Sequence, residues 1–160
     1  MKINFNSVIR PKPTPALIEE MEEEWEVRLP EDYRKFIMKY NGCVPKDCVF
    51  TCPNGRESCV MRFLCLLDSP EDHPLGDFDI NVVESRIFDL LTDNPHLVGM
   101  DLLPIASTVG FGDMLCLDFR KDRANPSVCV WFLKESRTWA PVSYPVADNF
   151  SQFLSMLRIP

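Results

Sequence analysis

Apolar residues recur along the chain with two different periods, which predict helices in some segments and strands in others. Between residues 15 and 26 they occur at spacings of one, three and four, as on one side of an α-helix. Thr14 and Pro15 are typical of a helix start, the first as a cap and the second as the first helical residue. The expected buried stripe of this helix is Leu17, Ile18, Met21 and Trp25.

Three further segments have helical spacing. The second predicted helix opens at Pro30 and stops at Asn41-Gly42. A middle helix is expected over residues 80–92, and a C-terminal helix is expected to follow a cap at Asp148. Their apolar stripes are Tyr33, Phe36, Ile37 and Tyr40, then Ile80, Val83, Ile87, Phe88 and Leu91, and finally Phe150, Phe153, Leu154 and Leu157.

Shorter β-prone runs, separated by turn signals, predict strands. Pro53-Asn54-Gly55 divides the first two runs, and the Gly110–Asp113 turn divides the next two. Consecutive strands joined by short loops favour antiparallel pairing. Residues 1–13 should form an arm or a short first strand. The expected strands are 49–52, 59–67, 102–107, 114–119 and 128–133.

The pattern as a whole predicts an α+β fold: one domain over residues 1–160, with a largely antiparallel sheet flanked by helices. The chain has 160 residues, of which 46% are hydrophobic and 26% charged. This is the composition of a globular protein, and it excludes fibrous, collagen-like and disordered classes. A chain of this length buries roughly 70% of its unfolded surface, so its core does not require disulfides.

Charge is concentrated in one segment. The formal net charge is −7, and residues 16–32 alone carry eight acidic residues and one basic residue. The remainder of the chain is balanced. An acidic segment repels nucleic acid and attracts basic proteins, so direct nucleic-acid binding is not expected. Two interpretations stay open: an ordinary solvated helix face, or a surface for a protein partner.

Helical geometry places Glu19, Glu23 and Glu26 opposite the buried stripe, and Glu20 and Glu22 beside them, so all five should face outward. On the strand 114–119, Asp118 shares a face with Met114 and Cys116, and we expect that face to be partly exposed. The candidate partner-binding residues are therefore Glu19, Glu20, Glu22, Glu23, Glu26 and Asp118.

Seven cysteines form an odd set, and no apolar leader with a cleavage site precedes them. We expect reduced thiols in a cytoplasmic protein. The most apolar stretch, 59–67, is interrupted by Arg62 and is far shorter than the roughly 20 residues of a membrane helix, so no membrane span is expected.

Candidate chemistry is sparse. Cys43, Cys48, Cys52 and Cys59 lie close in sequence, but they lack the CxxC spacing of a zinc site, and no metal is expected. The two histidines, His73 and His96, stand next to prolines in expected loops. The Gly110-Phe111-Gly112 turn lacks the lysine of a phosphate-binding loop. Asp113 is interpreted as a turn residue. We therefore expect neither catalytic residues nor a cofactor.

Four blocks in order resemble the SUKH superfamily (the SMI/KNR type), which includes bacterial toxin-immunity proteins and a fungal regulator of cell-wall synthesis. The blocks are LPEDYRKFIMKYNG (29–42), LLPIASTVGFGDMLCLDFR (102–120), VCVWF (128–132) and ADNFSQFLSML (147–157). The resemblance spans about residues 16–157. The segment 43–67, with its cysteine-rich hairpin, has no obvious counterpart in the family pattern.

The resemblance implies a single α+β domain and a binding role without catalysis. Bacterial members bind and neutralise secreted toxins, often nucleases, so the expected partner is a basic, nuclease-like toxin. The acidic helix would steer that encounter and take the place of the displaced anion. The alternative is a regulatory or scaffold module of the same fold that binds an endogenous partner, for example in cell-wall or stress regulation. A thiol or zinc enzyme is a third, remote alternative.

Overall fold

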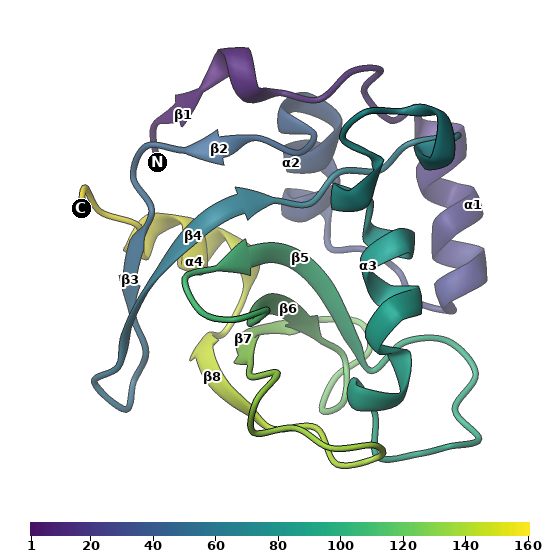
Figure 1. Cartoon of the computed structure of the whole chain (residues 1–160), viewed down its shortest axis with the longest axis vertical. Coiled ribbons are helices and arrows are strands. Elements are labelled where there is room, and N and C mark those ends of the chain that lie inside the picture. Colours follow the sequence, from purple (N-terminus) through teal and green to yellow (C-terminus); the bar gives the residue numbers. More distant parts are fainter.

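The computed structural model describes all 160 residues, and its order of helices and strands follows the predicted one closely (Figure 1). The four α-helices are α1 (Pro15–Trp25), α2 (Glu31–Tyr40), α3 (Ile80–Ile87) and α4 (Phe150–Met156). The strands are β1 (Ile3–Asn4), β2 (Val44–Pro45), β3 (Val49–Thr51), β4 (Glu57–Phe63), β5 (Leu102–Thr108), β6 (Met114–Asp118), β7 (Ser127–Trp131) and β8 (Ser143–Ala147).

Strands β3 to β8 form one six-stranded antiparallel sheet in which spatial order equals chain order. This order follows from short connections, because an antiparallel neighbour needs only a turn. The predicted pairing of segments 114–119 and 128–133 is confirmed, with Cys116 opposite Cys129. Strands β1 and β2 form a separate two-stranded sheet. The fold class is therefore a single α+β domain.

Helix starts follow local capping chemistry. The Thr14 hydroxyl accepts a hydrogen bond from the Leu17 amide at 3.2 Å, and Pro15 occupies the first turn of α1. Asp79 caps α3 in the same way. The cap of α4 is Asn149, one residue after the expected Asp148, because the Asn149 carboxamide is the group that reaches the Gln152 amide. The observed cap thus differs from the predicted one by one position.

Other boundaries differ more. The expected middle helix ends at Ile87 and continues as a 3-10 turn, Phe88–Leu90. The second hairpin strand begins earlier than expected and ends at Phe63. Strand β8 and the short strand β2 were missed. Pro145 and the polar residues of β8 lack a clear period-two pattern, as is common at a sheet edge.

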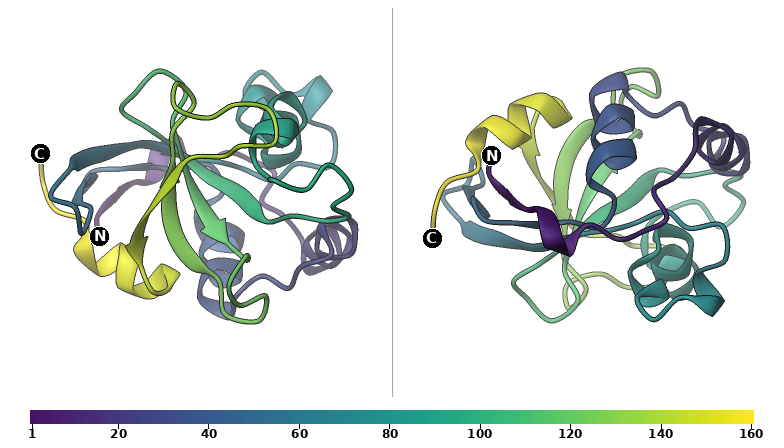
Figure 2. Two further views of the ribbon diagram at one scale, coloured as in Figure 1. Left: turned by 90° about the horizontal axis from the view of Figure 1, so that it is seen from below. Right: turned by 90° about the horizontal axis from the view of Figure 1, so that it is seen from above.

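Helices cover both faces of the sheet (Figure 2). Helices α2 and α4 lie on one side and α3 lies on the other, against β5. Between α2, α4 and the sheet is an aromatic cluster, in which Phe36 packs at 4.7 Å from Phe63 and 5.1 Å from Phe150 between ring centroids. A single cluster of 39 buried residues joins the helices to both sheet faces.

Asn41 ties the end of α2 to two other segments. Its side chain is fully buried, its Oδ1 accepts from the Leu66 amide at 2.8 Å, and its Nδ2 faces the carbonyls of Ile9, Pro11 and Leu66. The next residue, Gly42, has a φ of +64°, and a Cβ there would lie 2.5 Å from Ile9. The predicted Asn-Gly stop therefore also anchors the N-terminal arm.

Candidate protein-binding surface

The outward side of α1 carries five exposed glutamates, which we call the acidic surface. The helix is oriented by its buried stripe, which is the predicted one, and by the Trp25 indole N–H, which donates to the Asn81 side chain of α3 at 2.8 Å. Sequence periodicity did not assign Glu24 to this surface, although it is exposed. The members of the acidic surface are Glu19, Glu20, Glu23, Glu24 and Glu26.

Glu22 was expected to face outward, and this prediction is wrong. Only 9% of the residue is exposed. Its carboxylate accepts a hydrogen bond from the Leu29 amide at 2.9 Å and forms an ion pair with Arg34 at 3.1 Å. The chain between α1 and α2 folds back over this side of α1, a tertiary contact that helical periodicity does not contain. Glu22 therefore stabilises the turn between the two helices.

Part of the acidic surface is also neutralised within the chain. Arg34 reaches Glu19 at 3.3 Å, although the Glu19 side chain stays 67% exposed. At the other end, Arg123 donates to the backbone carbonyl of Glu26 at 3.1 Å and to that of Met100 at 3.2 Å. A cation at the C-terminal end of a helix is favourable, so Arg123 has a structural role at the end of α1.

Asp118 lies apart from the acidic surface. Its carboxylate makes a two-pronged ion pair with Arg120, at 2.9 Å to Nε and 2.7 Å to the terminal nitrogen, and only 11% of its side chain is exposed. Asp118 also raises the pKa of Arg120. The expectation of a partly exposed face is wrong for Cys116, which is fully buried. On strand β7, Trp131 stands opposite Met114, and its indole N–H donates to the Leu90 carbonyl at 2.9 Å, so the 3-10 turn after α3 covers this side of the sheet. No contact connects Asp118 with the glutamates of α1.

A family model, that of the SMI1 / KNR4 family (SUKH-1), matches residues 12–156, which is most of the chain. The chain belongs to this family. A search of curated proteins found none that matches. Family membership supports a non-catalytic immunity or regulatory module that acts by binding proteins. The family match begins just before α1 and ends at the last residue of α4, so it includes the acidic surface.

The two histidines both lie in loops. His73 is held in a loop, with Nε2 2.8 Å from the Arg10 carbonyl and Nδ1 accepting from the Leu75 amide, and His96 is exposed. No group of three or more His, Cys, Asp or Glu side chains is placed to hold a metal ion. None of the helices combines the length and the apolar character needed to cross a membrane.

The seven cysteines are free thiols, six of them buried and Cys59 half-buried. Burial raises the pKa of Cys43, Cys59 and Cys65 to about 12 in each case, which disfavours the reactive thiolate. In the β3–β4 hairpin the cysteines act as small apolar side chains of the core. The hairpin that lacked a counterpart in the family pattern thus forms an ordinary edge of the sheet.

Proposed function

We propose that this protein is a cytoplasmic immunity protein that neutralises a basic toxin of the nuclease type by covering the surface with which the toxin binds its substrate. The observation that carries this proposal is the acidic surface: five exposed glutamates on one helix of a family that acts by protein binding. Nucleases bind phosphates through lysine and arginine, so a dense row of carboxylates complements the same side chains.

The exposed glutamates are the proposed contact residues. Glu22 is not a contact residue, because its carboxylate binds Arg34 and the turn at the end of α1. Asp118 would join the interface only by exchanging its ion pair with Arg120 for one with the partner. The proposed contacts are therefore concentrated on α1, where carboxylates attract a cationic partner over a screening length of about 8–10 Å at ordinary salt.

The experiment is a measurement of association kinetics with the basic partner that a pull-down with this protein identifies. The test variant is Glu19→Gln, Glu23→Gln and Glu26→Gln combined. The control variant is Asp68→Asn, Glu71→Gln and Asp72→Asn combined, which changes the net charge equally at exposed positions outside α1. We expect the helix variant to lower k_on about tenfold at low salt, with a smaller loss at physiological salt, because steering is electrostatic.

The control variant should lower k_on much less. An unaltered k_on for the helix variant at both salt concentrations would reject the acidic surface as the binding surface. An equal loss for both triple variants would show that only net charge matters. Either result would leave the fold and the family unaffected.

A regulatory module with an endogenous partner is the second candidate, and a different surface favours it. The β5–β6 turn exposes Phe111 to 79% and Val109 to 58%, and the Lys134 ammonium lies 4.0 Å from the Phe111 ring centroid. Exposed apolar residues of this kind are typical of interaction sites. If Phe111→Ser abolishes binding of a host protein while the α1 triple variant does not, the regulatory role is favoured.

A further inference from the structure

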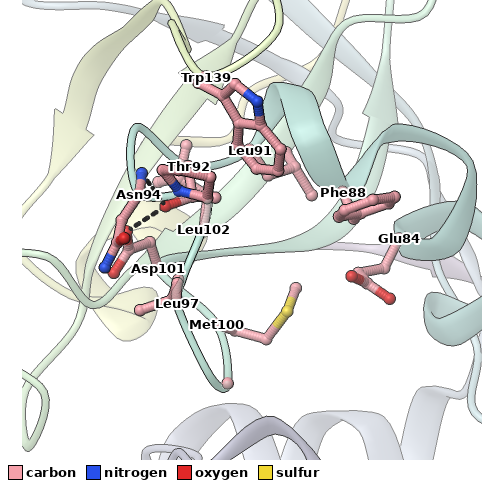
Figure 3. A pocket seen from close by; sticks show the side chains of 12 residues that line it. Glu84, Phe88, Leu91, Thr92, Asn94, Leu97, Met100, Asp101, Leu102 and Trp139 are labelled. Atoms are coloured by element: carbon pink, nitrogen blue, oxygen red, sulfur yellow. Dashed lines mark hydrogen bonds between the residues drawn. The ribbon is translucent and has the colours of Figure 1, made fainter.

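A small pocket opens beside the end of α3, between the loop that leads into β5 and the side chain of Trp139 (Figure 3). Its volume is about 80 Å³. Buried Leu91 and Leu102 contribute to its apolar floor, and Phe88 and Trp139 form an edge-to-face pair with centroids 6.1 Å apart. Sites for metabolites usually measure roughly 300 Å³ or more, so this pocket has room for a single side chain.

The polar groups of the pocket differ in whether they have partners. Asp101 accepts a hydrogen bond from the Thr92 hydroxyl at 2.8 Å and lies 3.7 Å from Arg123. The carboxylate of Glu84, in contrast, makes no hydrogen bond or ion pair, although the residue is half-buried. Figure 3 shows its carboxylate beside Phe88, across the pocket from Asp101. Burial, together with the negative charge of Glu24 on α1, raises the pKa of Glu84.

The pocket lies next to the acidic surface. The loop that lines it is hydrogen-bonded to α1, since the Met100 amide donates to the Trp25 carbonyl at 2.9 Å. At Gly99 this packing is so close that a Cβ would lie 2.5 Å from that carbonyl and 2.8 Å from Glu26. Gly99 also has a φ of +89°, which favours glycine. A protein docked on α1 therefore reaches the pocket with its neighbouring side chains.

We propose that this pocket receives one lysine side chain of the basic partner, with Glu84 holding the ammonium group and Phe88 and Trp139 flanking the methylene chain. The inference rests on the proposed function. It names the contact that would fix how the partner is aligned on this surface. Lysine combines an apolar stem with a compact charged end, which matches apolar walls with one unpartnered carboxylate. Aromatic walls also attract a cation.

Lysine fits this pocket better than arginine or a metal ion. The planar guanidinium is wider and is best bound by a carboxylate that accepts two parallel hydrogen bonds in an open plane. A divalent cation requires several oxygen ligands, whereas Asp101 is already engaged by Thr92 and Arg123. The side chain of Phe88, which lines the pocket and is 53% exposed, is accessible to an incoming side chain.

The test is an NMR titration of the full chain, labelled with nitrogen-15, with the peptide N-acetyl-Gly-Lys-Gly-amide. The matched peptide carries norleucine, which has nearly the same stem and no charge, in place of lysine. We expect the lysine peptide to shift the Trp139 indole signal and the amides of residues 88–101, with a dissociation constant on the order of millimolar. The norleucine peptide should bind at least about tenfold more weakly, because it leaves the Glu84 carboxylate without a partner.

Two variants and one control complete the test. Glu84→Gln should weaken the lysine peptide about tenfold, and Phe88→Ser should weaken both peptides, since it removes a wall. Both positions are partly exposed, so neither substitution should unfold the chain. The NMR signals of residues far from the pocket show whether the fold of each variant is intact. Glu71→Gln removes a charge from an exposed position outside the pocket and should leave binding unchanged.

Equal affinity for the two peptides, shifts confined to the outer side of α1, or no shifts up to the solubility limit would each overturn the pocket assignment. Failure of the proposed function has a different signature, because it affects k_on of the α1 triple variant and not the peptide titration. With the intact partner, Glu84→Gln should act mainly on k_off and should be less sensitive to salt than the α1 variant.

Discussion

At the scale of single residues, neighbouring glutamates of α1 have opposite roles. Glu22 and Glu23 are adjacent in sequence, yet Glu22 is buried against Leu29 and Arg34 and Glu23 is exposed. Hydrophobic periodicity correctly located the stripe of α1, because a stripe is a property of one helix. It misplaced Glu22, because the partners of that residue come from the following turn and from α2.

Glu22→Gln should lower the free energy of unfolding by about 1–3 kcal/mol, since a buried hydrogen-bonded ion pair loses its charge. Glu23→Gln is the matched control and should change it by less than about 0.5 kcal/mol. Urea denaturation of the two variants measures both values. Equal stabilities of the two variants would show that the Arg34 contact contributes nothing to the free energy of unfolding.

Glu84 should reveal its environment through the pH dependence of stability. Because its native pKa is raised above the ordinary value of 4.5, the folded chain holds this proton more tightly than the unfolded chain. The contribution of Glu84 to stability is therefore fully present below pH 4.5 and is lost as the pH rises through the native pKa. Glu84→Gln does not titrate, so it should be more stable than the natural chain at neutral pH.

That advantage should disappear in acid, below the unfolded pKa. The measurement is the midpoint of urea denaturation of both chains from pH 4 to pH 8. Glu71→Gln serves as the control and should show no gain of this kind. A constant difference between Glu84→Gln and the natural chain at every pH would contradict the prediction.

At the scale of elements, helices were easier to predict than their ends. Caps and prolines located the starts of α1 and α2, since those signals are local. The end of α1 gives no such signal: Glu26 closes it with a φ of +50°, a left-handed conformation that most side chains avoid. An expected cap at this point would be glycine, and the sequence instead has a charged residue.

Glu26→Gly should therefore raise the free energy of unfolding by about 0.5–1 kcal/mol, because glycine adopts this conformation without steric cost. Glu26→Ala removes the same charge but keeps the Cβ, so it should give no gain. Thermal and urea denaturation of the two variants check this. If the alanine variant is as stable as the glycine variant, relief of charge repulsion on α1 is the cause rather than the backbone.

The candidate site could be predicted less well than the fold. The acidic character of α1 was visible in composition, and strands β5 to β7 were visible in their apolar runs. The pocket beside α3 was not, because its residues come from segments more than fifty positions apart, with Glu84 and Trp139 at its two ends. Only tertiary packing brings them together. The role of Arg123 at the end of α1 was missed for the same reason.

At the scale of the whole molecule, surface and core agree with one folding unit. The accessible surface is 8233 Å², close to the roughly 8,200 Å² expected for a compact monomer of 18.5 kDa. The main core includes residues from all four helices and from both ends of the large sheet. We therefore expect a single cooperative unfolding transition of residues 1–160.

The cysteines allow that expectation to be tested at separate places in the fold. Cys59 is the half-buried thiol and should react first with iodoacetamide, though slowly, because its pKa is raised to about 12. Cys116 and Cys129 lie in the centre of the sheet, whereas Cys43 lies beside α2 and Cys48 next to the hairpin, all in the main core. If this core opens only as a whole, these four thiols should be alkylated at one common rate, and added urea should accelerate all four equally.

The measurement is peptide mass spectrometry of the alkylated chain over time. Labelling of Cys43 and Cys48 well ahead of Cys116 and Cys129 would show that the N-terminal half unfolds separately, and the chain would then have to be divided into two units.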